Sequence, residues 1–167
     1  MANQIVGELR AKSDAAFGNL TRQLRGMEPH MERADAPGQW TTRQVLSHLL
    51  FEPGWKPVDT LKTFAHTNLP VIEVTSLSDT SGARATMALG QFVDALDEQR
   101  RAVFGYLDTL SDADLGRKAR IPIFKEIMGT DEIPITTFVG ALFDHHWNDH
   151  GGQIVKIRTT AGLPPAE

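Results

Sequence analysis

Two histidines near the C-terminal end of the chain, His146 and His150, lie four positions apart. On an α-helix this spacing places two side chains about 40° apart around the axis and about 6 Å apart along it. Two imidazoles on one helical face can bind the same metal ion. Such a pair needs a further ligand, and the best candidate in the rest of the sequence is His48.

The neighbours of these histidines indicate that all three face the interior. His48 lies between Val45 and Leu49 on an earlier helical segment. Inward histidines without partners would each cost roughly 1–3 kcal/mol, whereas one metal ion satisfies all three. The alternative is an ordinary core histidine held by a hydrogen bond, because an HxxxH pair on a helix is more often incidental than metal-binding. The inward stripe on the last helix has three- and four-residue spacing and comprises Val139, Phe143, His146, His150, Gln153 and Ile157.

Other polar side chains are expected near the same site. Glu52 falls one turn after His48 and is the nearest candidate for a catalytic base or a carboxylate ligand, although a solvated helix end would explain it equally well. Gln153 could hydrogen-bond a ligand, cap the site or tie two helices together. Asp149 could orient a metal-binding histidine, or pair with His145 on the helix surface.

Four helices are expected to carry these residues. Thr41 and Gln44 fit a capping box at the start of the second helix, and Pro53-Gly54 breaks that helix soon after His48. Apolar residues at helical spacing predict helices over 5–27, 41–50, 83–110 and 136–160, with a further helical piece over 57–64.

The remaining segments are expected to be connections. Residues 67–82 are rich in polar residues and predict an ordered crossing loop, with a short extended piece at 69–74. Residues 117–135 predict a loop with a strand-like piece at 121–124. The whole chain, 1–167, is therefore expected to form a single all-α domain, an antiparallel four-helix bundle with long crossing loops.

The composition limits the classes of protein. The chain has 167 residues, of which 41 % are hydrophobic, which suits one folded domain. The net charge of −4 without a basic stripe argues against nucleic acid as a partner, and the apolar runs are too short to span a membrane. The first residues lack the features of a signal peptide and the chain has no cysteine, which together favour a cytoplasmic location. Any metal must therefore use histidine, carboxylate, backbone or water.

Two motifs resemble those of the DinB-like superfamily. The run Trp40-Thr41-Thr42-Arg43-Gln44-Val45-Leu46-Ser47-His48-Leu49 resembles the start of that superfamily's second helix, where a tryptophan precedes the first metal histidine. The run from His146 through His150 to Gly152-Gln153-Ile154 resembles its last-helix signature. One departure is Glu52-Pro53-Gly54, which interrupts the second helix near the expected mouth of the pocket.

The resemblance implies a four-helix bundle that tends to form homodimers. It implies a three-histidine site for zinc or nickel, with manganese and iron as alternatives, carried here by His48, His146 and His150. Relatives include bacillithiol S-transferases and mycothiol-dependent maleylpyruvate isomerase.

Three hypotheses about function follow. The first is a metal-dependent thiol S-transferase that takes a small-molecule thiol and an electrophilic substrate. The thiol would supply the nucleophilic sulfur, since this chain has no cysteine. The second is a metal-dependent hydrolase, for which Glu52→Gln should abolish hydrolysis while affecting thiol transfer less. The third is a non-enzymatic, metal-binding or structural dimeric bundle, whose stability should depend strongly on its metal.

Overall fold

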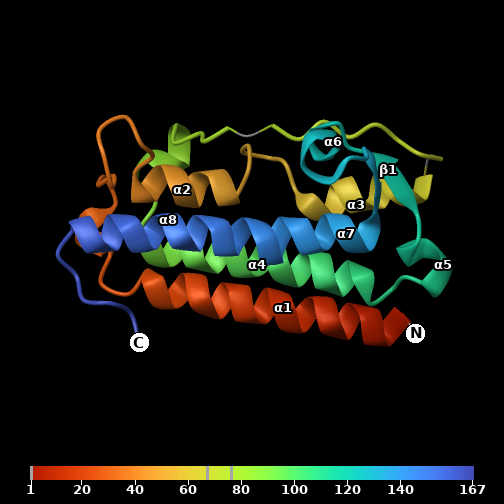
Figure 1. Cartoon of the computed structure of the whole chain (residues 1–167), viewed down its shortest axis with the longest axis horizontal. Helices are drawn as coiled ribbons and strands as arrows, with labels where there is room; N and C mark the ends of the chain where they lie inside the picture. The colour runs from red at the N-terminus through yellow and green to blue at the C-terminus, as the bar shows by residue number, and fades with distance from the viewer. Residues whose placement is uncertain (1, 67, 76) are drawn as a thin grey trace.

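Four helical rods lie side by side in the computed structural model, which describes residues 2–66, 68–75 and 77–167 (Figure 1). The expected four-helix bundle is confirmed, and within it α1 packs against α4, α7 and α8, while α2 contacts α4 and α8. The rods are α1 (Ala2–Gln23), the pair α2 (Thr42–Leu49) and α3 (Pro57–His66), α4 (Leu89–Leu107), and the continuous rod of α7 (Ile135–Gly140), a π-helical turn (Ala141–His145) and α8 (His146–Thr160).

The crossing segment between α3 and α4 sets the directions of the rods. In Figure 1 it returns along the length of the molecule, so α2–α3 and α4 point one way and α1 and α7–α8 the other. The segment is ordered by backbone pairing: the Ile72 N–H donates to the carbonyl of Arg120 at 2.8 Å, and the Arg120 N–H donates to that of Pro70 at 2.7 Å. The expected short extended piece therefore pairs with a strand later in the chain.

The second helix begins as expected and ends sooner than expected. The capping box is present, since Thr41 Oγ1 accepts from the Gln44 N–H at 3.2 Å and Gln44 Oε1 accepts from the Thr41 N–H at 2.8 Å. The helix ends at Leu49, and Phe51 then takes a left-handed backbone conformation with φ of 60°. A side chain beyond this turn no longer follows the face of α2, so the expected placement of Glu52 one turn after His48 is wrong.

The region after α4 is more structured than its sequence suggests. A strand was expected at 121–124, but Pro122 instead caps a short helix and Gly129, with φ of 76°, ends it. The two real strands flank this helix and pair antiparallel, which places Ala119 opposite Ile133. The elements are α5 (Asp112–Leu115), β1 (Lys118–Arg120), α6 (Ile123–Met128) and β2 (Glu132–Pro134).

The third helix also starts later than predicted. A short 3-10 helix covers Gly82–Ala85, and α4 begins only at Leu89. The reason is Arg84, whose buried guanidinium donates hydrogen bonds to the end of α2, including the carbonyl of Ser47 at 3.0 Å. These bonds hold the segment against α2 and away from the line of α4.

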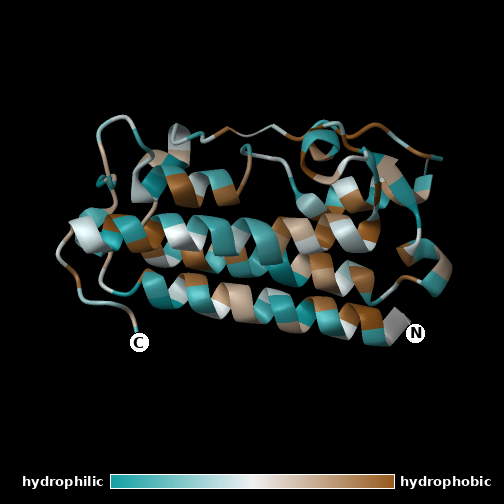
Figure 2. Ribbon diagram, in the orientation of Figure 1, coloured by the Kyte–Doolittle hydropathy of each residue, from teal (hydrophilic) through white to brown (hydrophobic). Residues whose placement is uncertain are grey.

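Apolar and polar residues alternate along each rod (Figure 2), and the buried apolar side chains form one core cluster. Trp147 is completely buried in this core, and its ring centroid lies 5.7 Å from that of Phe17 and 4.8 Å from that of Phe143. The tryptophan of the last helix is thus a packing residue. Among the described residues no helix is long and apolar enough to cross a lipid bilayer.

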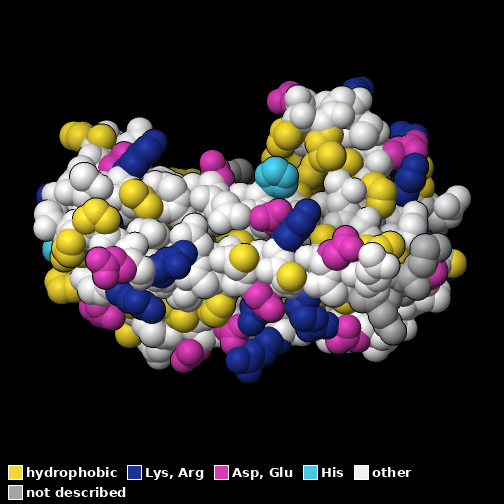
Figure 3. All heavy atoms as spheres, turned by 60° about the horizontal axis from the view of Figure 1, so that its bottom comes forward, with side chains coloured by type: hydrophobic (Ala, Val, Ile, Leu, Met, Phe, Trp, Pro, Cys, Tyr) yellow, Lys and Arg dark blue, Asp and Glu magenta, His cyan; other side chains and the backbone are white. Residues whose placement is uncertain are grey.

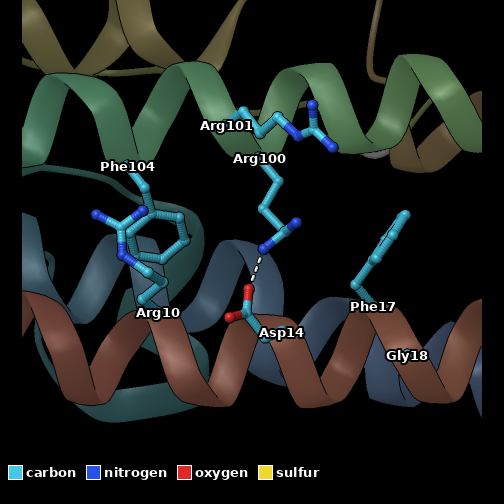
Figure 4. Close-up of a pocket in the computed structure, with 7 residues that line it drawn as sticks. All are labelled: Arg10, Asp14, Phe17, Gly18, Arg100, Arg101 and Phe104. Carbon is cyan, nitrogen blue, oxygen red and sulfur yellow. Dashed lines mark hydrogen bonds and ion pairs between the residues drawn. The ribbon is translucent and has the colours of Figure 1, made fainter.

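A shallow hollow between α1 and α4 carries charges that balance one another (Figure 4). Arg10 binds Asp108 through two contacts of 2.6 and 2.8 Å, and Arg100 binds both Asp14 and Asp97. Arg101, which also lines the hollow, pairs with Asp97. Each of the three arginines that line the hollow is therefore paired with a carboxylate, and the contacts of Arg10 and Arg100 join the two helices.

Candidate metal centre

The three histidines predicted from the sequence come together at the end of α2 and the start of α8. The Nε2 atoms of His48 and His146 lie 2.8 Å apart. One ligand nitrogen from each of His48, His146 and His150 can be chosen so that all three lie within 4.8 Å of one another. The rings meet edge to face, with centroids 4.7–4.9 Å apart. The arrangement brings three neutral nitrogen donors to one point.

The second nitrogen of two of the rings is already bound to the protein. His48 Nδ1 lies 3.0 Å from the carbonyl oxygen of Leu77, and His150 Nδ1 lies 3.0 Å from Gln153 Oε1. Because an oxygen can only accept, the Nδ1 atoms of His48 and His150 carry the proton and their Nε2 atoms present lone pairs. The Nε2 atom of His146 faces that of His48.

At 2.8 Å the Nε2 atoms of His48 and His146 are close enough either to share a proton in a hydrogen bond or to bind one cation together. Metal-binding histidines typically donate their other N–H to a carbonyl or a carboxylate, which fixes the ring and leaves one nitrogen for the ion. Here the carbonyl of Leu77 takes that part for His48, and the amide oxygen of Gln153 takes it for His150. The donor set thus fits a divalent ion with three imidazole ligands and open positions.

Burial favours the neutral form of His146 and His48. Loss of water around the ring lowers the pKa of His146 to about 3, and the nearby His150 and His48 add to the effect in that order. Burial is also the main cause of the lowered pKa of His48, partly opposed by its bond to Leu77. Neutral rings are the form that binds a metal.

The low pKa of His146 predicts a pH-dependent stability for the metal-free protein. The ring has a pKa of 6.5 unfolded and about 3 folded, so between these values the unfolded chain binds the extra proton. The contribution to stability is complete above pH 6.5 and is lost as the pH falls towards 3. We expect this group alone to lower the free energy of unfolding by about 1.4 kcal/mol on going from about pH 7.5 to about pH 5.5.

Urea unfolding of the metal-free parent and His146→Asn at both pH values measures this contribution. The variant should lose correspondingly less stability on acidification. Equal losses in the two proteins would contradict the assignment.

A π-helical turn, Ala141–His145, directly precedes His146. Such turns are rare and frequently occur at functional sites. The buried core face of the rod runs through Phe143, Trp147 and Ile154, whereas His146 and His150 are half-buried beside it. The expected single inward stripe is therefore split: its apolar members lie in the core and its histidines lie at the edge of the core.

The half-buried histidines open into a cleft of about 840 Å³. Phe51 lies beside the candidate metal site, with its ring centroid 5.6 Å from that of His146. The Trp55 ring packs against Phe51 at a tilt, with the two centroids 4.4 Å apart. The polar side chains of Lys12, Asp144, His145 and Asp149 also line the cleft. An ion at the three histidines would face this cleft.

Trp40 closes another side of the histidine cluster. Its ring lies 4.7 Å from that of His48 and 6.1 Å from that of His150. Trp40 therefore packs against two of the candidate ligands, His48 and His150.

The other candidates are placed differently. Glu52 is exposed, and its Oε1 accepts a hydrogen bond from Thr75 Oγ1 at 2.7 Å, so it reaches the cleft only through Thr75, which lines it. Gln153 orients His150 by accepting from its Nδ1. Asp149 lines the cleft, and no hydrogen bond in the described part of the chain joins it to a histidine.

The backbone carbonyl of Leu77 is a group that the sequence did not reveal. It orients the candidate ligand His48 through a main-chain oxygen. A main-chain acceptor is independent of residue type, so the sequence of the crossing segment contains no trace of the bond to His48.

Comparison with known proteins relates the fold to a solved structure. No family model and no curated protein matches this sequence. The structure of YfiT from Bacillus subtilis, described as "a probable metal-dependent hydrolase with an unusual four-helix bundle topology", matches over 95 % of this chain and 89 % of its own, with a TM-score of 0.74 and 18 % sequence identity. The chain has the fold of YfiT. The expected four-helix bundle is thereby confirmed, and at this identity the likeness to YfiT concerns the fold alone.

Proposed function

We propose that His48, His146 and His150 hold a divalent metal ion and that the protein is a metal-dependent enzyme. The observation that carries the proposal is the convergence of three histidine nitrogens within 4.8 Å of one another, with the Nδ1 atoms of His48 and His150 already committed to protein acceptors. Zinc and nickel are the first candidates, because imidazole nitrogen suits both, and manganese or iron are alternatives. YfiT, with the same fold, is described as a probable metal-dependent hydrolase.

Hydrolysis is the reaction that the cleft supports best. A divalent ion at this site would supply Lewis acidity, which polarises a carbonyl and lowers the pKa of a water or a thiol. The chain itself must then supply a base within reach of a water molecule. Asp149 lines the cleft one position before His150 and is our candidate for that base. Glu52, the candidate from the sequence, lies outside the cleft lining and acts on it through Thr75.

Hydrolysis of a 4-nitrophenyl ester by the zinc-loaded chain tests this assignment. We expect Asp149→Asn to lower kcat/KM by about 10²–10³-fold, the usual contribution of a positioned base, without loss of bound zinc. Glu52→Gln should change kcat/KM by only about twofold, since its contact with Thr75 can be kept by an amide. The opposite ranking would make Glu52 the base, and parent activity in both variants would leave hydrolysis without its proposed machinery.

Thiol S-transfer is the second candidate function. The cleft, at about 840 Å³, is large enough for a small thiol and an electrophile together, and the chain has no cysteine of its own to act as nucleophile. Transfer needs no base for water, so Asp149→Asn should spare it. Incubation of the zinc-loaded chain with a low-molecular-weight thiol and 1-chloro-2,4-dinitrobenzene would show thioether formation if this reaction is the true one.

Two further expectations stay predictions. The resemblance to the DinB-like superfamily implies a homodimer, which sedimentation velocity would show as a single species of twice the chain mass. A cytoplasmic location follows only from the sequence features described above.

A further inference from the structure

The helix α6 exposes its apolar side chains to the cleft. None of its six residues is buried. Ile123, Ile127 and Met128 are exposed by 42 %, 74 % and 50 %, and all three line the cleft that contains the histidines. Figure 3 shows hydrophobic side chains gathered on a raised part of the surface, with a histidine at its foot. Large apolar side chains grouped in this way generally mark a binding surface.

The exposure of α6 is built into the fold. The strands β1 and β2 pair on either side of the helix, and the Ile121 N–H donates to the carbonyl of Asp131 at 2.8 Å, closing the base of this unit. Ile121 and Ile133 are buried beneath it. The hairpin is therefore anchored in the core, and the chain presents α6 to the cleft at a fixed place.

The apolar wall lies in the same cleft as the candidate metal site. From the ring of His146 it passes to Phe51 and Trp55, and it includes Val74 and the apolar side chains of α6. The polar residues of the cleft lie on other elements: Lys12 on α1, Thr75 on the crossing segment, Thr137 on α7, Asp144 and His145 on the π-helical turn, and Asp149 on α8. A molecule bound to the ion would thus extend between an apolar wall and a polar edge.

We infer that the substrates are acyl compounds, such as esters or amides, whose acyl group is an extended apolar chain that packs against α6. The inference rests on the proposed function, because the metal site fixes where the acyl carbonyl lies. Ile123 and Ile127 are one helical turn apart and would contact the same chain. Contact with this wall removes apolar surface of both partners from water, which favours longer chains.

The test is the binding of a series of n-alkyl hydroxamates, from acetohydroxamate to octanohydroxamate, to the zinc-loaded and the zinc-free chain. The hydroxamate group binds zinc, and the alkyl chain reports on the wall. We expect acetohydroxamate to need zinc and each added methylene to lower Kd by about two- to fourfold, fourfold being the value for complete burial. Ile127→Asn should flatten this dependence on chain length. The matched control is Val155→Asn on α8, another exposed apolar residue outside the cleft lining, which should keep it.

The outcomes separate the inference from the proposed function. Zinc-dependent binding that is equal for all chain lengths would overturn the inference and leave the metal site intact. Kd values that fall with chain length but are the same with and without zinc would overturn the metal site and keep the apolar subsite. Dissociation of a dimer by Ile127→Asn, with an unchanged chain-length series, would make α6 a subunit contact and overturn the inference. Absence of any binding would overturn both.

Discussion

His146→Ala is expected to weaken zinc binding by more than about a hundredfold. Loss of a group that merely orients a metal ligand typically costs 10–100-fold in affinity, so loss of a ligand itself should cost more. His146 contacts both other candidate ligands: its Nε2 lies 2.8 Å from that of His48, and its ring centroid lies 4.9 Å from that of His150. The measurement is a titration of zinc against a competing chromophoric chelator.

The neighbouring histidine gives the matched control. His145 lines the same cleft, is exposed, and does not belong to the three-histidine group. His145→Ala should therefore keep the parent affinity within about twofold. If His145→Ala lost zinc and His146→Ala retained it, the ligand set proposed here would be wrong.

Arg84→Met is expected to lower the free energy of unfolding by about 3 kcal/mol. The guanidinium of Arg84 is buried, and burial lowers its pKa, with Asp79 partly opposing this effect. It donates to the carbonyl of Ser47 at 3.0 Å, to that of Phe51, and to Ser47 Oγ at 3.2 Å. These carbonyls lie at the end of α2, where no further helical turn can satisfy them.

The same substitution should also weaken the metal site. His48 lies in the last turn of α2, next to Ser47, and Phe51 stands beside His146 in its left-handed turn. Loosening this end of α2 would release both, so zinc affinity should fall by about tenfold, the lower end of the range for lost ligand orientation.

Urea unfolding with the variants Arg84→Lys and Arg101→Met completes this test. Arg84→Lys keeps a donor and should lose less stability than Arg84→Met. Arg101, on α4, pairs with Asp97 and is 76 % exposed, so Arg101→Met should cost about 0.5 kcal/mol or less. If Arg84→Met lowered the free energy of unfolding no more than Arg101→Met does, the hydrogen bonds of Arg84 would contribute little to stability.

The candidate ligands could be predicted from the sequence because their signal is local. His146 and His150 have helical spacing, and the Thr41–Gln44 capping box fixes where the helix of His48 begins. These features depend on residues a few positions apart, which a single sequence displays. The four rods follow from the same kind of local periodicity.

The features that the sequence did not reveal depend on contacts between distant segments. The Arg84 side chain donates to a backbone carbonyl at the end of α2, which is distant in the sequence, and α4 begins later than predicted. Glu52 does not lie where the sequence predicted, because Phe51 before it adopts a positive φ. Tertiary packing must support this conformation in a residue that is not glycine. The helix α6 was missed because its Ile-Pro-Ile-Phe start has the composition of a strand.

The most direct test of the three-histidine site is a crystal structure of the zinc-loaded chain with anomalous diffraction recorded at the zinc edge. We expect one strong anomalous peak per chain, about 2.0–2.1 Å from Nε2 of each of His48, His146 and His150. The Nδ1 atoms of His48 and His150 should keep their present acceptors, the carbonyl of Leu77 and Oε1 of Gln153. A peak at other side chains, or no peak together with a direct hydrogen bond between His48 and His146, would contradict it.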